Sequence, residues 1–289
     1  QALAEFLREN DVKEYHVPKI LSELTRQVSS GDPSFTKIAG LPHKLYGLLP
    51  GPFTVLSSKV VECVVGAGGD TTKMVVELQD GKRVESVIMK YDPKNASGGE
   101  GKAKPGKGRT TLCVSSQVGC QMGCKFCATG TMGLQGNLTS AEIVEQLVHA
   151  LAVDPKVTNV VFMGMGEPLN NYAPVVEAVK LMTDDRVFGL SPNRVTISTV
   201  GVTNRIISLA EDLPSCNLAL SLHAPSQDLR LSIVPSGRAY PVPKLLSAVR
   251  RWQDATRKKV FLEYVVLGGI NDGEEHAREL GEVLAEHGV

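Results

Sequence analysis

Residues 111–130, TLCVSSQVGCQMGCKFCATG, join a strand-like apolar run to three closely spaced cysteines. The run begins a region in which apolar segments alternate with amphipathic helical patterns. Five segments are expected to form strands: 111–116, 157–165, 194–201, 217–223 and 259–268. Five helices are expected between or after them: 139–152, 174–183, 203–211, 243–254 and 273–286. Continuous apolar strands alternating with helices predict an α/β fold whose parallel sheet is covered by helices.

The number of these units limits the architecture. Five βα units are too few for a closed eight-fold barrel, so they predict a doubly wound sheet or an open, partial barrel. Either fold binds ligands at the C-terminal ends of its strands. The helix expected at 139–152 opens with Thr139 and Glu142, which have the spacing of a capping box.

Residues 1–91 have a different pattern and predict an accessory region of short helices followed by a β-hairpin. Leu3, Phe6 and Leu7 have helical spacing. Asp80-Gly81 lies between two strand-like runs and has the signature of a two-residue hairpin turn. Residues 92–110 are rich in glycine and lysine and predict a flexible basic linker. The α/β domain is expected to occupy residues 111–289.

The composition excludes several classes of protein. A chain of 289 residues that is 42% hydrophobic can bury a sizeable core and is not disordered over most of its length. Its 31 basic and 31 acidic residues exclude a uniformly basic nucleic-acid binder and leave room for local basic patches. No apolar run approaches the roughly 18–20 residues that span a bilayer, and no secretory signal is visible. Six cysteines are too few for a disulfide scaffold and favour a reducing compartment.

Cys120, Cys124 and Cys127 carry the strongest chemical signal. They form a C-x3-C-x2-C loop at the end of a strand where ligands bind, and thiolates ligate zinc or iron–sulfur clusters. Structural zinc sites usually add a second pair of ligands, which is not evident here, although Cys113 is a candidate for a fourth ligand. Three ligands to a four-iron cluster would leave one iron open to a substrate or cofactor. Zinc binding and three buried structural cysteines are the alternatives.

The cysteine spacing after the first strand of an α/β region resembles the radical S-adenosylmethionine (SAM) superfamily. Further motifs resemble the RlmN/Cfr family of ribosomal and transfer RNA adenine methyltransferases. These motifs are LCVSSQVGCQMGCKFCATG (112–130), VVFMGMGEPLNNY (160–172), RVTISTVG (194–201), ALSLHAP (219–225) and EYVVLGGINDG (263–273). The resemblance is clearest over residues 111–276 and implies the open βα barrel of radical SAM proteins.

The resemblance implies two cofactors. Cys120, Cys124 and Cys127 would hold a [4Fe–4S] cluster, and its open iron would bind SAM. A reductant protein such as a flavodoxin or ferredoxin would supply the electron that cleaves SAM to a 5′-deoxyadenosyl radical. The residues that match SAM-binding positions are Gly166, Glu167, Ser198, Ser221, Leu222 and His223. From the local sequence alone, Glu167 is equally compatible with a solvated turn, and strand serines and a lone histidine are more often structural.

The resemblance also implies a reaction, the transfer of a methyl group from SAM to C2 of adenine, or to C8 in Cfr-like enzymes. In the family the methyl group passes through a cysteine in the C-terminal tail. Cys113 matches the cysteine that resolves the protein–RNA crosslink and leaves a disulfide, and Glu85 matches a proposed proton acceptor. By itself Glu85 is an ordinary hairpin carboxylate. The sequence ends at Val289, before the tail cysteine and a SAM-contacting asparagine, so we expect a truncated form that cannot complete methyl transfer.

RNA binding would have to come from local positive charge. The candidate phosphate contacts are Lys102, Lys104, Lys107, Arg109, Arg250, Arg251, Arg257, Lys258 and Lys259. Exposed helix faces carry such charges equally well without binding anything. A non-catalytic RNA-binding module with structural zinc or a vestigial cluster is the rival from another class. We expect a monomer without membrane association, in the cytoplasm, or in an organelle if a transit peptide precedes Gln1.

Overall fold

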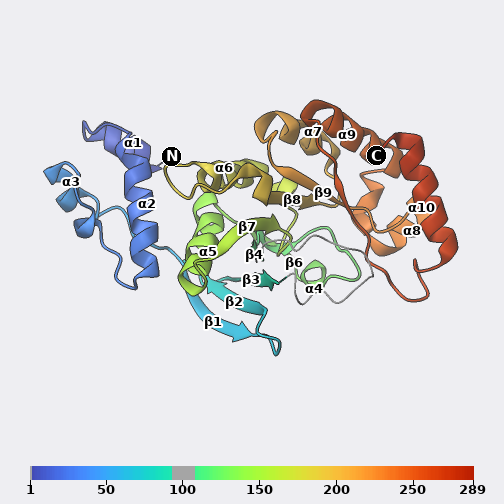
Figure 1. Cartoon of the computed structure of the whole chain (residues 1–289), viewed down its shortest axis with the longest axis horizontal. Coiled ribbons are helices and arrows are strands. Elements are labelled where there is room, and N and C mark those ends of the chain that lie inside the picture. Colours follow the sequence, from blue (N-terminus) through green and yellow to red (C-terminus); the bar gives the residue numbers. More distant parts are fainter. Residues whose placement is uncertain (1, 93–107) are drawn as a thin grey trace.

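The computed structural model describes residues 2–92 and 108–289, and an eight-stranded sheet runs through its centre (Figure 1). The strand order is β1-β2-β3-β4-β7-β8-β9-β10. The strands are β1 (Lys59–Val65), β2 (Thr71–Glu77), β3 (Arg83–Tyr91), β4 (Arg109–Cys113), β7 (Val157–Phe162), β8 (Val195–Thr199), β9 (Asn217–Ser221) and β10 (Phe261–Glu263). A separate two-stranded ribbon pairs β5 (Gln117–Cys120) with β6 (Gly133–Asn137).

The sheet combines two kinds of pairing. Strands β1 to β4 pair antiparallel, and β4, β7, β8, β9 and β10 pair parallel. Among the described strands, β1 and β10 are the two edges and do not pair with each other. The sheet is therefore open. This confirms the expected α/β class with a parallel sheet that does not close into a barrel.

Helices follow the parallel strands as the sequence pattern predicts. They are α5 (Ser140–Val153), α6 (Tyr172–Thr183), α7 (Thr203–Asp212), α9 (Val242–Thr256) and α10 (Glu274–His287). The capping box of α5 is formed, because the Thr139 hydroxyl accepts from the Glu142 N–H at 3.2 Å and Glu142 accepts from the Thr139 N–H at 2.8 Å. Two short helices, α4 (Ala128–Thr131) and α8 (Gln227–Ile233), and the β5–β6 ribbon were not predicted.

The two faces of the parallel strands differ in chemistry because side chains alternate along a strand. One face is apolar and buried in the main core with the helices. It includes Leu112, Val160, Phe162, Ile197, Leu218 and Leu220. The other face carries Cys113 on β4, Ser198 on β8, Ser221 on β9 and Glu263 on β10. This polar face and the C-terminal strand ends hold the candidate site.

The last strand is shorter than predicted. Strand β10 spans Phe261–Glu263, whereas the apolar run suggested 259–268. The Asn271 side chain explains where the strand ends. Its Nδ2 donates to the carbonyls of His223 at 2.8 Å and Val265 at 2.7 Å, and its Oδ1 accepts from the Leu267 N–H at 2.7 Å. The amide thereby occupies backbone groups that a longer strand would need for sheet pairing.

The predicted hairpin joins β2 and β3, but its turn is longer than two residues. The Leu78 N–H donates to the Lys82 carbonyl at 2.8 Å, which leaves Gln79, Asp80 and Gly81 in the loop. Within this loop only Gly81 has a positive φ, of 80°. A two-residue type I′ turn requires two such residues, whereas a three-residue loop requires one.

The N-terminal helices build a core of their own. Helices α1 (Ala2–Glu9), α2 (His16–Ser29) and α3 (His43–Leu48) lie at one end of the molecule (Figure 1). Their small core includes Leu7, Ile20, Leu24, Ile38, Leu45 and Leu49. The hairpin instead extends the central sheet through β3–β4 pairing, and Met74, Val84 and Ile88 lie in the main core. None of the helices in the described ranges is long and apolar enough to cross a membrane.

The predicted linker at 92–110 lies largely outside the described residues. This holds for Lys102, Lys104 and Lys107, three of the candidate phosphate contacts. Arg109, the fourth charge of that run, begins β4, and its guanidinium lies over the Tyr91 ring, 5.0 Å from the centroid.

A single carboxylate connects the chain after the N-terminal helices to the α/β core. Glu145 on α5 accepts from the Ser57 N–H at 2.9 Å, the Ser57 hydroxyl at 3.0 Å and the Ser58 N–H at 2.8 Å. The Ser58 hydroxyl donates to the same carboxylate and lies 3.0 Å from His149 Nε2. The segment that leads into β1 is therefore fixed on α5.

We expect Glu145→Ala to lower the free energy of unfolding by about 1–3 kcal/mol, since it leaves several donors without their acceptor. Limited proteolysis between residues 30 and 58 should become faster. Urea denaturation measures the first effect and peptide mapping the second. Glu211→Ala, on the exposed surface of α7, is the matched control and should change stability by less than about 0.5 kcal/mol. Equal effects of the two substitutions would contradict the proposed role of Glu145.

Candidate active site

The three cysteines of the motif lie on one compact loop. Cys120 ends β5, and Cys124 and Cys127 precede α4. The Cys127 N–H donates to the Cys124 carbonyl at 3.1 Å, and the Met122 N–H lies 3.5 Å from Cys120 Sγ. Gly130 closes the loop tightly, because a Cβ there would lie 2.9 Å from the Cys124 carbonyl oxygen. The fold thus gathers the predicted ligands in one place.

Two thiols of this loop, Cys120 and Cys124, have raised pKa values. Burial, together with the neighbouring Cys120 and Cys127, raises the pKa of Cys124 to about 11, although the Arg230 charge lowers it. Burial also raises the pKa of Cys120, and Glu167 and Cys127 add to that effect. Because thiolates are the ligating form, a metal centre would have to stabilise these three negative charges.

The donor set fits an iron–sulfur cluster better than a single ion. Within residues 2–92 and 108–289, no three histidine, cysteine, aspartate or glutamate side chains gather closely enough to hold one metal ion. A cluster distributes its irons over a larger volume and accepts cysteine ligands alone. All six cysteines are free thiols, including Cys113 and Cys216.

The glycine-rich segment 164–167 holds the cysteine loop against the sheet. The Met165 N–H donates to the Ser115 hydroxyl at 2.9 Å, and the Met165 carbonyl accepts from the Ser116 N–H at 2.8 Å. A Cβ at Gly164 would lie 2.7 Å from the Val114 carbonyl oxygen. At Gly166, where φ is +101°, it would lie 2.6 Å from the Gln117 Cβ. Both glycines allow a close approach of two chain segments.

Glu167 is buried rather than solvated, with 3% of its surface exposed. Its Oε1 accepts from the Leu169 N–H at 3.0 Å and its Oε2 from the Val200 N–H at 2.9 Å. Burial raises its pKa to about 7, despite these hydrogen bonds. The carboxyl group therefore joins the ends of β7 and β8. The alternative of a solvated side chain is wrong, while its predicted contact with SAM stays a prediction.

The predicted serines meet on the polar face of the sheet. Ser198 and Ser221 have their hydroxyl oxygens 3.3 Å apart, and both donate to Glu263 Oε2, at 2.8 and 2.6 Å. Cys113 shares this face, and burial raises its pKa to about 11, with a further contribution from the Glu263 charge. Strands β8, β9 and β10, together with β4, thus contribute polar groups to one surface.

His223 continues this cluster beyond β9, next to Leu222. Its backbone has a φ of +63°, and its Nδ1 accepts from the Val265 N–H at 3.1 Å. Its ring packs edge-on against Phe126 of the cysteine motif, with ring centroids 4.8 Å apart. Burial lowers the pKa of His223 to about 4, so the imidazole is neutral near pH 7. The Leu222 N–H donates to the Glu263 carbonyl at 3.1 Å.

Glu85 lies on β3, which neighbours the Cys113 strand. Its carboxylate pairs with Lys73 at 3.0 Å, its carbonyl accepts from the Ser115 hydroxyl at 2.6 Å, and its N–H lies 3.4 Å from Met165 Sδ. The backbone of Glu85 therefore contacts the segments that hold the cysteine loop, while its side chain is half exposed. Its role as a proton acceptor stays a prediction.

Sequence reasoning missed Arg230, a fully buried residue of α8. Its guanidinium donates to the carbonyls of Leu222 at 3.0 Å and Val200, among others at the ends of β8 and β9. In the described part of the chain it forms no ion pair, and its charge lowers the pKa of Cys124. Helix α8 also contacts the cysteine loop directly, because the Ile233 carbonyl accepts a hydrogen bond from the Lys125 N–H at 2.9 Å. The signal in the sequence was the position of this arginine between two apolar residues, Leu229 and Leu231, which indicates burial.

Glu263 was also missed as an individual residue, although its motif was recognised. A single carboxylate in an apolar strand was the available signal.

Two of the predicted basic phosphate contacts already have partners within the protein. Lys258 Nζ donates to the Ser215 carbonyl at 2.6 Å and to Asn193 Oδ1 at 2.8 Å, and Arg250 pairs with Asp254 at 3.1 Å.

Comparison with known proteins agrees with this geometry. Residues 114–281 match the family model described as the radical SAM superfamily. The chain is 43% identical over 240 residues to "Ribosomal RNA large subunit methyltransferase N" of Nitrosopumilus maritimus, covering 82% of this chain and 66% of the relative. It is 33% identical over 288 residues to "Ribosomal RNA large subunit methyltransferase Cfr" of Lachnoclostridium phytofermentans, covering 100% of this chain and 78% of the relative.

A solved structure is also similar, that of a radical SAM methyltransferase from Sphaerobacter thermophilus. It has a TM-score of 0.85 and 36% identity, and the match covers 98% of this chain and 79% of the other. The matched part is slightly less than two thirds of the length of the Nitrosopumilus relative.

The burial of Glu167 generates a pH prediction. Its carboxyl ionises near pH 4.5 when unfolded and near pH 7 when folded. Between these values the unfolded chain releases a proton that the folded chain keeps, so rising pH lowers stability by up to about 3 kcal/mol. Glu167→Gln should lack this loss, which urea denaturation of the cofactor-free protein below pH 4.5 and above pH 7 can measure. Glu211→Gln is the exposed control, and parallel pH profiles for wild type and Glu167→Gln would refute the expectation.

Proposed function

Because this chain belongs to the radical SAM superfamily and, within it, to the RlmN/Cfr family, we propose that it is an enzyme that methylates RNA. The proposed reaction transfers a methyl group from SAM to C2 of adenine in ribosomal RNA, transfer RNA or both. The observation that carries the proposal is the junction of a three-cysteine loop with a polar sheet face at the C-terminal strand ends. A structural zinc module would not need that polar face.

The proposed cofactors are a [4Fe–4S] cluster and SAM. Cys120, Cys124 and Cys127 would ligate the cluster, which supplies the electron for reductive cleavage of SAM when both are bound. Arg230 lies close enough to lower the pKa of Cys124, so its positive charge would stabilise the thiolate form of this ligand. The contact between Phe126 and His223 would connect the cysteine loop to the end of β9.

The polar face offers hydrogen-bonding groups for SAM. Ser198, Ser221 and Glu263 form a connected set, and their hydroxyls and carboxylate suit an ammonium or ribose hydroxyl. Gly166 and Glu167 would contribute from the end of β7, with the buried Glu167 holding the Val200 backbone in place. Leu222 and His223 would complete the pocket beyond β9. Cys113 and Glu85 are proposed as the groups that act on the methylated adenine intermediate.

We favour C2 over C8 because the N-type relative is 43% identical to this chain and the Cfr relative 33%. RNA would have to present an extruded adenine to a site at the edge of the sheet. A small reductant protein such as a flavodoxin or ferredoxin, a monomeric state and a cytoplasmic location complete the proposal.

The cofactor proposal predicts a defined spectroscopic result. Anaerobic reconstitution followed by reduction should give the electron paramagnetic resonance signal of a four-iron cluster, and SAM should change it. Cys124→Ser should lose most of the bound iron, whereas Cys216→Ser, which changes a cysteine outside the loop, should retain it. A zinc content of one per chain without iron and sulfide would instead support the zinc-containing module.

The position of methylation can be tested separately. RNA incubated with SAM and a reduced chain that includes the family's tail cysteine should yield 2-methyladenosine after digestion to nucleosides, as identified by mass spectrometry against synthetic standards. 8-Methyladenosine would replace the C2 assignment with the Cfr-type reaction. A chain that includes the family's tail cysteine provides the decisive outcome. If it cleaves SAM but methylates neither C2 nor C8 of adenine in any ribosomal or transfer RNA, the catalytic proposal is rejected.

A further inference from the structure

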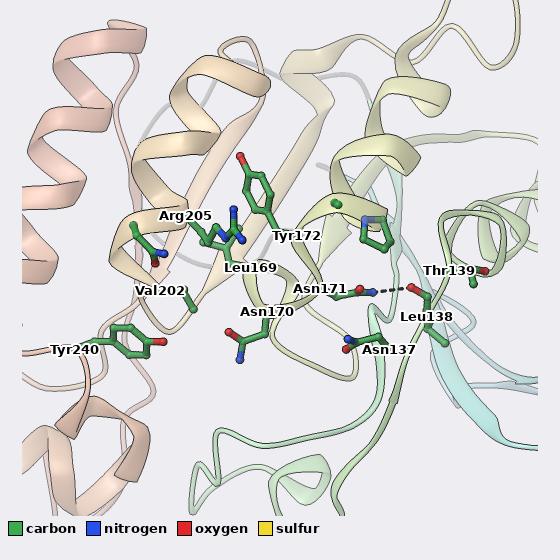
Figure 2. A pocket seen from close by; sticks show the side chains of 13 residues that line it. Asn137, Leu138, Thr139, Leu169, Asn170, Asn171, Tyr172, Val202, Arg205 and Tyr240 are labelled. Carbon is green, nitrogen blue, oxygen red and sulfur yellow. Dashed lines mark hydrogen bonds between the residues drawn. The ribbon is translucent and has the colours of Figure 1, made fainter. Parts of the chain in front are cut away.

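A cavity of about 710 Å³ lies beside the candidate site and is not used by it. Figure 2 shows its lining, which comes from chain segments far apart in the sequence. Asn170 follows β7, Arg205 belongs to α7, and Tyr240 precedes α9. The volume is suited to a group the size of a nucleotide.

The lining has the chemistry of a site for single-stranded nucleic acid. It offers two phenol rings, four asparagine side chains and one cation, Arg205, with no acidic side chain among its lining residues. The guanidinium of Arg205 lies over the Tyr172 ring, 4.7 Å from the centroid. Aromatic rings stack on bases, amides bond to base edges, and arginine binds phosphate.

One of these groups lacks an internal partner. Asn170 Nδ2 is buried and makes no hydrogen bond within the described part of the chain. In Figure 2 the Asn170 amide and the Tyr240 hydroxyl point toward one another across the cavity. An unpaired buried donor costs stability.

The helices that begin at this cavity add positive potential. The side chain of Asn171 does not cap α6. Its Nδ2 donates to the carbonyls of Ser116 at 2.8 Å and Leu138 at 2.7 Å, and Figure 2 shows the bond to Leu138. Val202, before α7, has no capping side chain. The first N–H groups of both helices therefore lack a side-chain cap next to Arg205.

The position of the cavity links it to the reaction. Leu169 in its wall donates its N–H to Glu167, and Asn171 contacts the segment that leads to the cysteines. The cavity thus shares chain segments with the proposed SAM pocket at the C-terminal strand ends. A second cavity, lined by Lys90, Asp154 and Arg194, lies at the opposite strand ends and combines both signs of charge.

We propose that this cavity binds an unpaired nucleotide of the substrate RNA that flanks the target adenine. Arg205 binds its phosphate, and Asn170 and Tyr240 bind the edge of its base. The cavity holds the RNA strand while the target adenine enters the site. This inference rests on the proposed RNA substrate and adds where the strand is bound.

The test uses fluorescence anisotropy with a short fluorescein-labelled single-stranded RNA, over a range of salt concentrations. Arg205→Ala should weaken binding roughly three- to tenfold and reduce the slope of log affinity against log salt by about 0.7, the value of one phosphate contact to a single strand. Arg194→Ala removes an exposed arginine of the second cavity and is the matched control. It should leave both quantities unchanged.

Asn170→Leu separates binding from folding. Because the substitution removes an unpaired donor, the melting temperature of the free protein should not fall, while RNA affinity should fall at least about threefold. Photo-crosslinking of RNA that contains 4-thiouridine should label peptides with Tyr172 or Tyr240. If the unaltered protein does not bind RNA, the proposed function and this inference both fail. If it binds and both variants match it, this inference alone is overturned.

Discussion

Backbone contacts between residues 114–117 and 164–167 position the rest of the site. They place the start of the cysteine loop against the segment that ends β7, with no space for a Cβ at Gly164 or Gly166. The Glu167 N–H extends this contact by donating to Gln117 Oε1 at 2.8 Å. The loop is therefore held by the sheet itself, and its thiols take a fixed position relative to the polar strand ends. Preorganisation of this kind is what a reactive cofactor requires from its protein.

Buried charge gives the site its second property. Arg230 is a buried cation whose hydrogen bonds within the described residues all go to backbone carbonyls. Glu167 is a buried carboxyl group whose pKa lies near 7. Charges in a low-dielectric interior interact strongly, so the cysteine loop lies within a positive field from one side. The Arg230 charge lowers the pKa of Cys124 and so favours its thiolate, while burial of the loop opposes that form.

The sequence predicted what depends on local pattern. Most strand and helix positions of the α/β domain, the capping box at Thr139 and the cysteine cluster follow from neighbouring residues and were found. The missed features depend on distant contacts. Asn271 ends β10 through its bonds to His223 and Val265, and Arg230 reaches carbonyls at the ends of two strands. The burial of Glu167 likewise depends on Val200, a residue from another strand end. Periodicity cannot report such pairings, since they arise only when the sheet assembles.

The order of strands in the sheet has a consequence for biosynthesis. Within the eight-stranded sheet, which leaves out β5 and β6, the spatial order of the strands follows their order along the chain. Each strand leaving the ribosome therefore finds its partner already in place, and the N-terminal helical core can form before any strand is made. Assembly advances along a single growing edge. Until the next strand arrives, that edge is the part of the nascent chain most exposed to mispairing, and chaperones would have most reason to cover it.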